Sequence, residues 1–198
     1  MLLFADVETT GLSPEDDKLL EVAFVLTDDM LQIRDEISIV IHRDYIEYDS
    51  AADRWEPPFG INKIVVDMHN ESGLWRACNN APSSFTTRRV ENLLCDWVEA
   101  HGAKDLPLVG NTIGFDRNFI RLHMPRLHAM FHYRSLDISS IKIASLLWNP
   151  LDATEQPRND KVHRALPDCH DSIRELDAYR RIIFHHDFAD FEKDPSAR

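Results

Sequence analysis

Two acidic residues near the start of the chain are spaced to share a metal ion. An apolar run begins at Met1 and continues into Phe-Ala-Asp-Val-Glu-Thr-Thr-Gly, which predicts a buried strand over Leu2–Val7. Asp6 and Glu8 are two residues apart, and such residues point to the same face of a strand. Two carboxylates on one face of a buried strand repel each other unless a cation lies between them, so the pair indicates a divalent-metal site. The alternative is that both acids face solvent on an edge strand.

Two further acids and a histidine are candidates for the same site. Asp116 follows a short apolar run and a turn, and it opens a predicted helix. In His163-Arg-Ala-Leu-Pro-Asp168, Asp168 falls in the first turn of the last predicted helix and His163 lies on the loop before it. A histidine beside a metal-bound water is the usual general base near neutral pH. Spacing alone explains Asp116 equally well as a favourable charge at a helix start, and ten histidines leave His163 undistinguished.

Other residues compete for these roles. Asp171 and Glu175 lie on nearly the same helical face as Asp168, so the spacing does not choose among the three. A zinc site near the end of the chain is a further alternative, but the spacings match no zinc pattern. The residues that such a site would use are His163, Cys169, His170, His185 and His186.

The composition is that of an acidic globular protein. A length of 198 residues suits one domain, with 43% hydrophobic and 28% charged residues. No apolar run approaches the ~18 residues of a membrane span, and no leader pattern precedes the first strand, so we expect neither a span nor a signal peptide. Three cysteines without Cys-x-x-Cys favour a reducing compartment, and we expect a cytoplasmic protein. The net charge of −12 argues against a grip on long nucleic acid.

The apolar pattern predicts an α/β domain with a mixed sheet, because three strands come first and strands then alternate with helices. We expect one domain over residues 1–187 and a disordered tail over 188–198. Residues 43–68, which contain Pro57-Pro58, are predicted to form a long loop with at most one helical turn. The predicted strands are Leu2–Val7, Leu19–Thr27, Gln32–His42 and Leu106–Val109. The predicted helices run from a cap at Ser83 or Ser84 to His101, and over 115–123, 136–148 and 167–186.

Several stretches of the chain resemble the DEDDh 3′→5′ exonucleases, a family named for four acids and a histidine. The strand with Asp6 and Glu8, the Asp116 segment and His163-x-x-x-x-Asp168 carry this resemblance. Three longer stretches narrow it to the oligoribonuclease branch of the family; they are residues 69–74, 109–120 and 124–139. The resemblance spans nearly the whole chain. It implies a ribonuclease-H-like fold, with a mixed sheet flanked by helices, and a 3′→5′ exoribonuclease that degrades short RNA to mononucleotides.

The resemblance also implies roles for particular residues. It places Asp6, Glu8, Asp116 and Asp168 as ligands of two Mg²⁺ or Mn²⁺ ions, His163 as general base, and Asp171 outside the metal site. Such ions lie on the attacking and leaving sides of the phosphate in two-metal enzymes. A homodimer is implied, with substrates of about two to five nucleotides, dinucleotides favoured, whose bases stack on protein side chains. The implied substrate contacts are Leu12 between the bases, the partner subunit's Tyr133 on the 3′ base, and Thr112, Arg134 and His69 near the 5′ phosphate.

Two alternatives to this function differ in what they require. A DEDDh exonuclease for longer single-stranded RNA or DNA would need a basic channel, and a closed cap on the 5′ phosphate would exclude it. A binding protein without activity is disfavoured because all five catalytic positions are filled. The segment 43–68 is longer than expected for the family, which leaves its effect on the mouth of the site open.

Overall fold

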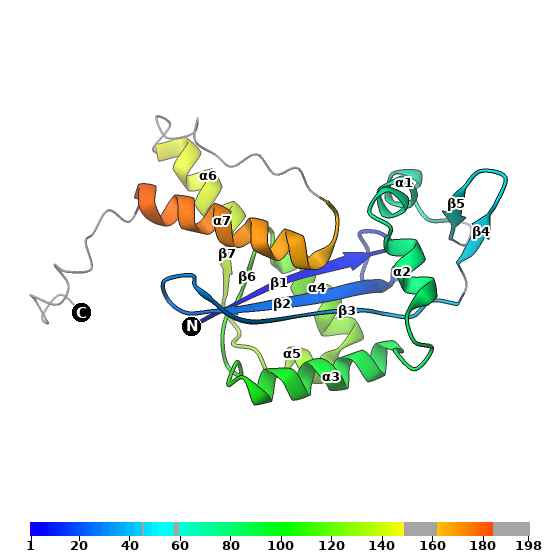
Figure 1. Ribbon diagram of the computed structural model, residues 1–198. Coiled ribbons are helices and arrows are strands. Elements are labelled where there is room, and N and C mark those ends of the chain that lie inside the picture. Colours follow the sequence, from blue (N-terminus) through cyan, green and yellow to red (C-terminus); the bar gives the residue numbers. More distant parts are fainter. Residues whose placement is uncertain (45, 58–59, 149–161, 184–198) are drawn as a thin grey trace, which may run out of the picture.

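A mixed five-stranded sheet with the strand order β3-β2-β1-β6-β7 forms the centre of the molecule (Figure 1). This computed structural model describes residues 1–44, 46–57, 60–148 and 162–183. The first three strands form an antiparallel meander, and β6 and β7 continue the sheet parallel to β1. The predicted α/β class with a mixed sheet is confirmed. The strands are β1 (Leu2–Thr9), β2 (Leu19–Thr27), β3 (Ile33–Val40), β6 (Leu108–Gly110) and β7 (Ser135–Asp137).

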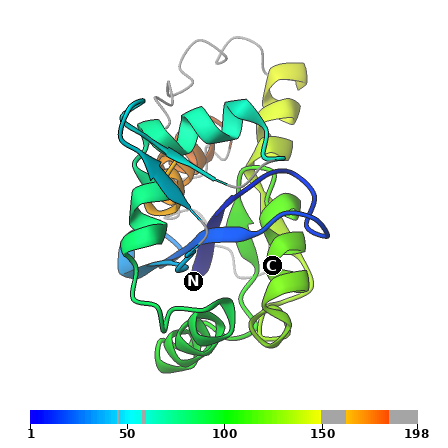
Figure 2. The ribbon, with the colours of Figure 1, turned by 90° about the vertical axis from the view of Figure 1, so that its right-hand side faces the viewer.

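The two faces of the sheet are covered by different helices, and this arrangement decides where the acids lie. The helix α7 (Ala165–Ile183) lies across one face and α3 (Thr87–Ala100) across the other, as Figure 1 and Figure 2 both show. Phe4 of β1 belongs to the buried cluster that α7 contributes to. Because side chains alternate along a strand, Asp6 and Glu8 share the face of Phe4 and lie on the side of α7. The remaining helices are α1 (Lys63–Glu71), α2 (Leu74–Asn80), α4 (Gly114–His123), α5 (Pro125–His128) and α6 (Ile138–Trp148).

The segment 43–68 is more regular in its described part than the predicted loop. It contains a two-stranded hairpin, β4 (Glu47–Asp49) with β5 (Arg54–Glu56), and the first residues of α1. The side chain of Asn70 joins the hairpin to α1: its Oδ1 accepts from the Trp55 nitrogen at 2.8 Å and its Nδ2 donates to the Trp55 carbonyl at 2.9 Å. The loop prediction was wrong because these three-residue strands depend on a contact with a distant helix and have no periodic pattern of their own.

The start of α3 also differs from the prediction. Its N-cap is Thr86, whose hydroxyl accepts a hydrogen bond from the Arg89 nitrogen at 3.3 Å. The predicted cap at Ser83 or Ser84 was therefore two or three residues early, since several hydroxyl residues in a row are all acceptable caps. No helix in the described parts of the chain is long and apolar enough to cross a bilayer.

Two helices later in the chain start at other residues than predicted. Leu136, predicted to start a helix, lies in β7 opposite Val109, and the helix α6 follows it. The helix α7 begins at Ala165, so Pro167 lies inside its first turn, where proline is tolerated because the first nitrogens have no helical acceptor. The predicted helix end near His186 and the predicted tail over 188–198 lie outside the described residues.

Candidate active site

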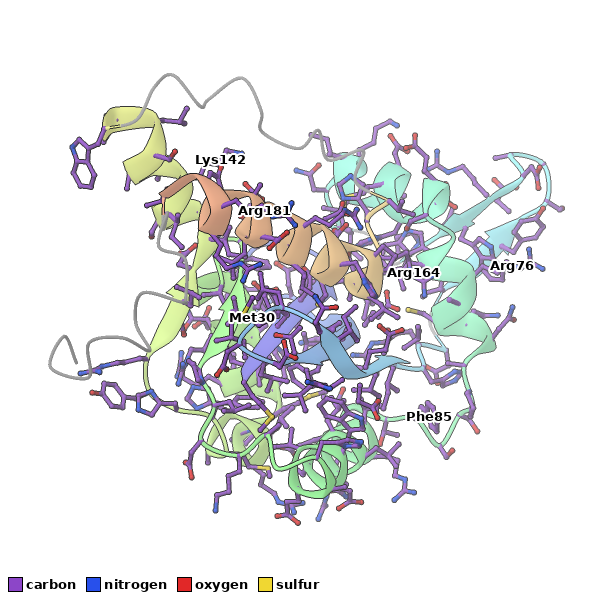
Figure 3. All side chains as sticks on the ribbon, turned by 60° about the vertical axis from the view of Figure 1, so that its left-hand side comes forward. Met30, Arg76, Phe85, Lys142, Arg164 and Arg181 are labelled. Atoms are coloured by element: carbon purple, nitrogen blue, oxygen red, sulfur yellow. The ribbon has the colours of Figure 1, made fainter. Side chains whose placement is uncertain are left out.

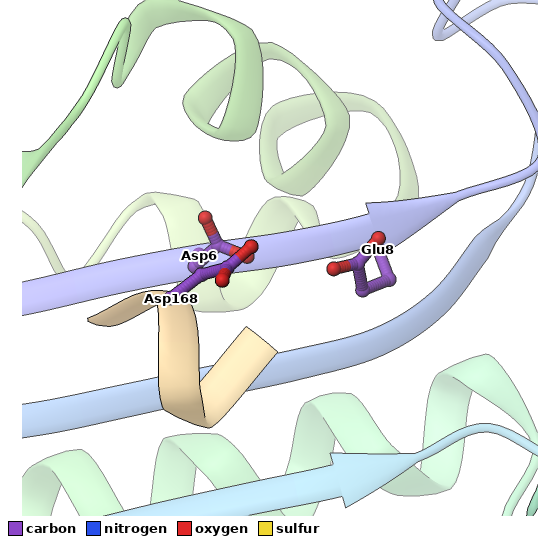
Figure 4. Close-up of side chains that lie close together, drawn as sticks. All are labelled: Asp6, Glu8 and Asp168. Carbon is purple, nitrogen blue, oxygen red and sulfur yellow. The ribbon is translucent and has the colours of Figure 1, made fainter. Parts of the chain in front are cut away.

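Three carboxylates from two distant segments meet at the end of β1 (Figure 4). Asp6 and Glu8 come from one face of the strand, and Asp168 comes from the first turn of α7. One oxygen from each of the three carboxylates lies within 4.8 Å of the other two. The sheet and the helix that packs on it therefore bring together acids that are about 160 residues apart in sequence, which is the non-local placement that a parallel or mixed α/β fold produces.

The chemistry of this cluster fits a divalent cation. Three carboxylates this close repel one another, and both Glu8 and Asp168 are buried, so water screens the repulsion poorly. The amino end of the 19-residue helix α7 adds a partial positive charge next to Asp168. Hard oxygen ligands are those that Mg²⁺ and Mn²⁺ prefer in proteins. The donors present therefore match the ions that the resemblance implies.

Asp116 reaches the same region from α4. Its side chain is buried, and its Oδ1 accepts a hydrogen bond from the backbone nitrogen of Val7 at 2.9 Å. Val7 lies between Asp6 and Glu8 on β1, so Asp116 borders the acid cluster without belonging to the group of three closest carboxylates. The strand β6 pairs with β1 only at Leu3 and Phe4, and Asp116 thus satisfies a strand nitrogen beyond the end of its neighbour.

A cleft of about 570 Å³ opens over these acids. His163 lies in its wall, directly before α7, with a left-handed backbone at φ 52°. Thr112 lies in the wall as well, also with φ 52°. Non-glycine residues in this conformation are uncommon, and they concentrate at functional sites where the surrounding fold holds them. The candidate residues that line the cleft are Asp6, Glu8, Leu12, Thr112, Asp116, His163 and Asp168.

Tyr133 and Arg134 are not among the residues that line this cleft. The Tyr133 side chain is 72% exposed, and the Arg134 guanidinium lies 5.2 Å from the centre of its ring. Both residues follow the turn after α5 and project from the surface of the chain. The contacts that the resemblance implies for them are thus not made within one subunit in this structure, and they stay predictions.

His69 lies behind the cluster and not on the surface of the cleft. Its side chain is fully buried, its Nε2 donates to the Thr9 carbonyl at 2.8 Å, and its Nδ1 lies 4.0 Å from Glu8 Oε2. Burial lowers the pKa of this imidazole, and a smaller opposing effect comes from the bond to Thr9. The role near the 5′ phosphate also stays a prediction, because in this structure the side chain contacts β1 and Glu8.

The competitors of Asp168 have other partners. Asp171 pairs with Arg174, three residues further along α7. Glu175 accepts a hydrogen bond from Asn111 Nδ2 at 2.9 Å and lies 3.5 Å from Lys142 Nζ. Among the described residues, neither acid belongs to the group of close carboxylates. The residues considered for zinc do not gather either: Cys169 is buried against the Ala23 carbonyl, His170 pairs with Glu36, and His185 and His186 lie outside the described residues.

Sequence reasoning missed a polar network in the cleft wall. The backbone nitrogen of Thr112 donates to Asp137 Oδ1 and to Ser139 Oγ at 3.0 and 3.1 Å. The Ser139 hydroxyl also donates to Asn111 Oδ1 at 3.2 Å. Asn111 and Ser139 stand in the stretches that carry the family resemblance, which is a signal that could have found them. Lys142, which also lines the cleft, has no such signal.

Comparisons with known proteins found relatives that match nearly the whole chain. No family model matches the chain. The oligoribonuclease of Mycobacterium ulcerans is 39% identical over 186 residues, which cover 92% of this chain and 81% of that protein. The oligoribonuclease of Mycobacterium leprae is 38% identical over the same shares. The oligoribonuclease of Nocardia farcinica is 39% identical over 187 residues, 93% of this chain and 81% of that protein.

Solved structures of exonuclease I share the fold. The E. coli enzyme, in a zinc-bound complex with single-stranded DNA, superposes with a TM-score of 0.64 at 14% identity and covers 92% of this chain. Exonuclease I of Methylocaldum szegediense gives a TM-score of 0.62 at 15% identity over 91% of this chain. The chain spans about 40% of the length of both enzymes. The predicted ribonuclease-H-like fold of DEDDh exonucleases is confirmed.

Proposed function

Because the chain belongs to the oligoribonuclease family, we propose that the cleft over Asp6, Glu8 and Asp168 is its active site. The chain is a 3′→5′ exoribonuclease that acts on short RNA, as predicted. The proposal concerns which residues carry this activity and which substrates are preferred. The observation that carries it is the convergence of three carboxylates within 4.8 Å at the floor of the cleft.

The metal ligands in this proposal are Asp6, Glu8, Asp116 and Asp168, which would hold two Mg²⁺ or Mn²⁺ ions. Four carboxylates give only oxygen donors, as these ions prefer. When bound, the ions supply charge neutralisation of the phosphate and stabilisation of the attacking and leaving oxygens. The hydrogen bond from Val7 to Asp116 fixes that carboxylate against β1, so the ligands of the site are held by one rigid strand and the two helices α4 and α7.

His163 acts as the general base. Its place in the cleft wall, directly before the helix that carries Asp168, supports this role. The imidazole accepts the proton of the attacking water, and the products are nucleoside 5′-monophosphates. A histidine suits this step because its ordinary pKa lies near neutral pH.

Substrate recognition uses side chains that one subunit leaves exposed. Leu12 is 82% exposed at the edge of the cleft, where an apolar side chain can wedge between two bases. Tyr133 lies outside the cleft of its own chain, which supports stacking of the partner subunit's Tyr133 on the 3′ base in a homodimer. The exposed apolar side chains of α6 support association of two chains as well, since large exposed apolar patches mark interaction sites. These side chains are Ile143, Leu146, Leu147 and Trp148.

The 5′ phosphate is recognised by Thr112 and Arg134, with His69 near the same group. Support for Thr112 comes from its place in the cleft wall beside the Ser139 hydroxyl. The cleft suits substrates of about two to five nucleotides, dinucleotides favoured, since stacking and end recognition need no long basic track. Among the described residues that line it, Lys142 and His163 are the basic ones. The alternative of a longer single-stranded substrate fits this lining less well. Buried free cysteines support a cytoplasmic location.

The proposal is tested by turnover of a 5′-phosphorylated diribonucleotide. We expect hydrolysis to mononucleotides with Mg²⁺ or Mn²⁺, loss of activity in EDTA, and recovery when the ion is added back. A 20-nucleotide RNA should be cleaved at least about tenfold more slowly, because a chain of net charge −12 gains little from a long phosphate track. Equal rates on both substrates, or activity that survives EDTA, would contradict the proposal.

A further inference from the structure

An ion pair with a buried carboxylate joins the segment that carries His163 to the central sheet. Arg164 donates from Nε and Nη2 to the two carboxylate oxygens of Glu21 on β2, at 2.8 and 2.9 Å. Figure 3 shows Arg164 at the start of α7. The Glu21 side chain is 3% exposed and that of Arg164 is 28% exposed. A two-pronged arginine–carboxylate pair fixes orientation as well as distance, which a single hydrogen bond does not.

Glu21 has further donors that make the arrangement rigid. The backbone nitrogen of Ala165 donates to its Oε2 at 3.2 Å, and the Ser38 hydroxyl of β3 donates to its Oε1 at 2.8 Å. Burial alone would raise the pKa of Glu21, but the hydrogen bonds and charge of Arg164 outweigh burial and lower that pKa. Glu21 is therefore an anion whose two oxygens are held by three residues from two segments, the start of α7 and the strand β3.

The pair lies directly beside the acid cluster. Glu21 is the register partner of Glu8 in the antiparallel pair of β1 and β2, and directly opposed residues share a face of the sheet. An additional acid at this position would increase the repulsion within the cluster if it had no cationic partner. Arg164 removes that cost and at the same time connects the sheet to the start of α7.

The arginine of the Glu21–Arg164 pair lies next to His163 in the sequence. His163 immediately precedes Arg164, and its left-handed backbone needs support from its surroundings because the conformation is unfavourable for an L-residue. Glu21 fixes the side chain of Arg164 and the backbone of Ala165, the two residues that follow His163. The carbonyl of Arg164 accepts from the Asp168 nitrogen at 3.1 Å in the first turn of the helix.

We propose that the Glu21–Arg164 ion pair positions His163 for catalysis. Neither Glu21 nor Arg164 touches the substrate; they act through the backbone on which the imidazole stands. The inference rests on the proposed function, in which His163 is the general base. The competing explanation is that the pair only supports the fold or the acid cluster, where loss of one partner would leave an uncompensated buried charge.

A double-mutant cycle separates these explanations. The double variant Glu21→Gln/Arg164→Gln removes both charges together, so that no buried charge is left alone. We expect its kcat on a 5′-phosphorylated diribonucleotide to fall about 10- to 100-fold with KM unchanged, as for other residues that orient a catalytic group. In a His163→Ala background the same substitutions should cost less than about twofold, because residues that act through one another are non-additive.

Either of two results would overturn the proposal. An equal loss in both backgrounds would mean that the pair acts on the metal site or the fold, and an unchanged kcat in the presence of His163 would mean that it does not act at all. If Glu21→Gln/Arg164→Gln does not fold, Arg164→Lys keeps the charge but loses the two-pronged geometry. It should give a smaller loss, again only where His163 is present, and an additive loss would equally reject the proposal.

Two readouts do not depend on turnover. In the metal-free protein, the imidazole NMR signal of His163 should shift or broaden in the double variant, while the signal of His101 should not. Mn²⁺ affinity from calorimetry should stay within about twofold, since the carboxylates remain. The matched control is Asp177→Asn/Arg180→Gln, an Arg–Asp pair further along α7, which should leave kcat unchanged. Failure of wild-type protein to cleave the diribonucleotide would reject the proposed function, whereas additivity in an active enzyme rejects this inference alone.

Discussion

The two halves of the site are built in different ways. The acid half, with Asp6, Glu8 and Asp168, is contributed by β1 and α7 of one chain, and its carboxylate oxygens lie within 4.8 Å of one another. The proposed recognition half is exposed: Leu12 and Tyr133 are 82% and 72% exposed, and Tyr133 lies outside the cleft. The three carboxylates are thus brought together within one chain, whereas the proposed recognition residues are not.

This difference follows from what each half must do. Groups that perform chemistry must be held to within a fraction of an ångström, and strands and helices with packed supports provide that precision. Groups that stack on bases need apolar surface that is covered only when the substrate or a second subunit arrives. Substitutions in the acid half should therefore abolish activity in the same chain, and substitutions in the recognition half should be graded and repairable by another chain.

The largest expected effect is at Asp168. Asp168→Asn should lower kcat by about a thousandfold or more, because it removes a charge that would hold the metal ions in the proposed site. The control is Asp171→Asn, three residues further along the same helix, where the partner is Arg174 and activity should change by less than about threefold. Single-turnover cleavage of a diribonucleotide measures both variants, with circular dichroism as the check on folding.

The assignment of Asp168 to the metal site would be contradicted if Asp168 and Asp171 exchanged roles. Full activity in Asp168→Asn together with loss in Asp171→Asn would place the metal site on another face of α7.

A smaller effect is expected at Tyr133. Tyr133→Ala should weaken the catalytic complex by about 1–3 kcal/mol, the contribution of stacking one base on an aromatic ring. The measurement is kcat/KM for a diribonucleotide, and light scattering compares the oligomeric state of the variant with that of wild type.

The same variant tests whether the recognition half comes from the other chain. Mixing Tyr133→Ala with Asp168→Asn and allowing subunits to exchange should give about a quarter of wild-type activity, since half of the re-formed dimers are mixed and each contains one intact site. No gain after verified exchange would mean that Tyr133 serves the cleft of its own chain.

The next effect concerns the 5′ phosphate. Arg134→Gln should cost about 1.5–3 kcal/mol on a 5′-phosphorylated diribonucleotide, as expected for a hydrogen bond to a charged group. The same substitution should have little effect on a 5′-hydroxyl substrate. The control is Arg174→Gln, an exposed arginine that pairs with Asp171, which should leave the ratio of the two substrates unchanged. An equal loss on both substrates would assign Arg134 to the fold or to dimerisation.

The same division explains what could be predicted from sequence. The buried strand with Asp6 and Glu8 was predictable from local pattern, because alternation along a strand fixes which side chains share a face. The convergence of Asp168 with this pair was not, since α7 reaches β1 only through tertiary packing. The family resemblance, and not the spacing, selected Asp168 over Asp171.

Secondary structure could likewise be predicted only where the local sequence pattern is long enough. Long strands such as β2 (Leu19–Thr27) were predicted at their observed bounds, because all of the nine residues except Glu21 and Thr27 are apolar. The hairpin β4–β5 and the strand β7 (Ser135–Asp137) were missed, because three residues carry no detectable period. Each depends on a partner elsewhere in the chain, Asn70 for the hairpin and β6 for β7.

The smallest expected effect decides to which half His69 belongs. The resemblance places it near the 5′ phosphate, and the structure places it behind Glu8 with Nε2 donating to the Thr9 carbonyl. If it supports the acid half, His69→Gln should cost about 1–2 kcal/mol of unfolding free energy at pH 7.5, as for a buried hydrogen bond, and leave the preference for a 5′-phosphorylated over a 5′-hydroxyl substrate unchanged. A reduced preference would assign His69 to phosphate recognition.

The pH dependence of stability provides an independent test of the same assignment. Burial lowers the pKa of His69 in the folded state, so the unfolded chain binds a proton at this residue more readily than the native protein does. Above the unfolded pKa of about 6.5 both states are neutral and the full stability is present, and stability is lost as the pH falls below that value toward the folded pKa. Urea unfolding in EDTA at pH 7.5 and 5.5 should therefore show a smaller loss for His69→Gln than for wild type. Parallel losses would mean that the imidazole is protonated equally in both states, which would contradict a supporting role as a buried neutral group behind Glu8.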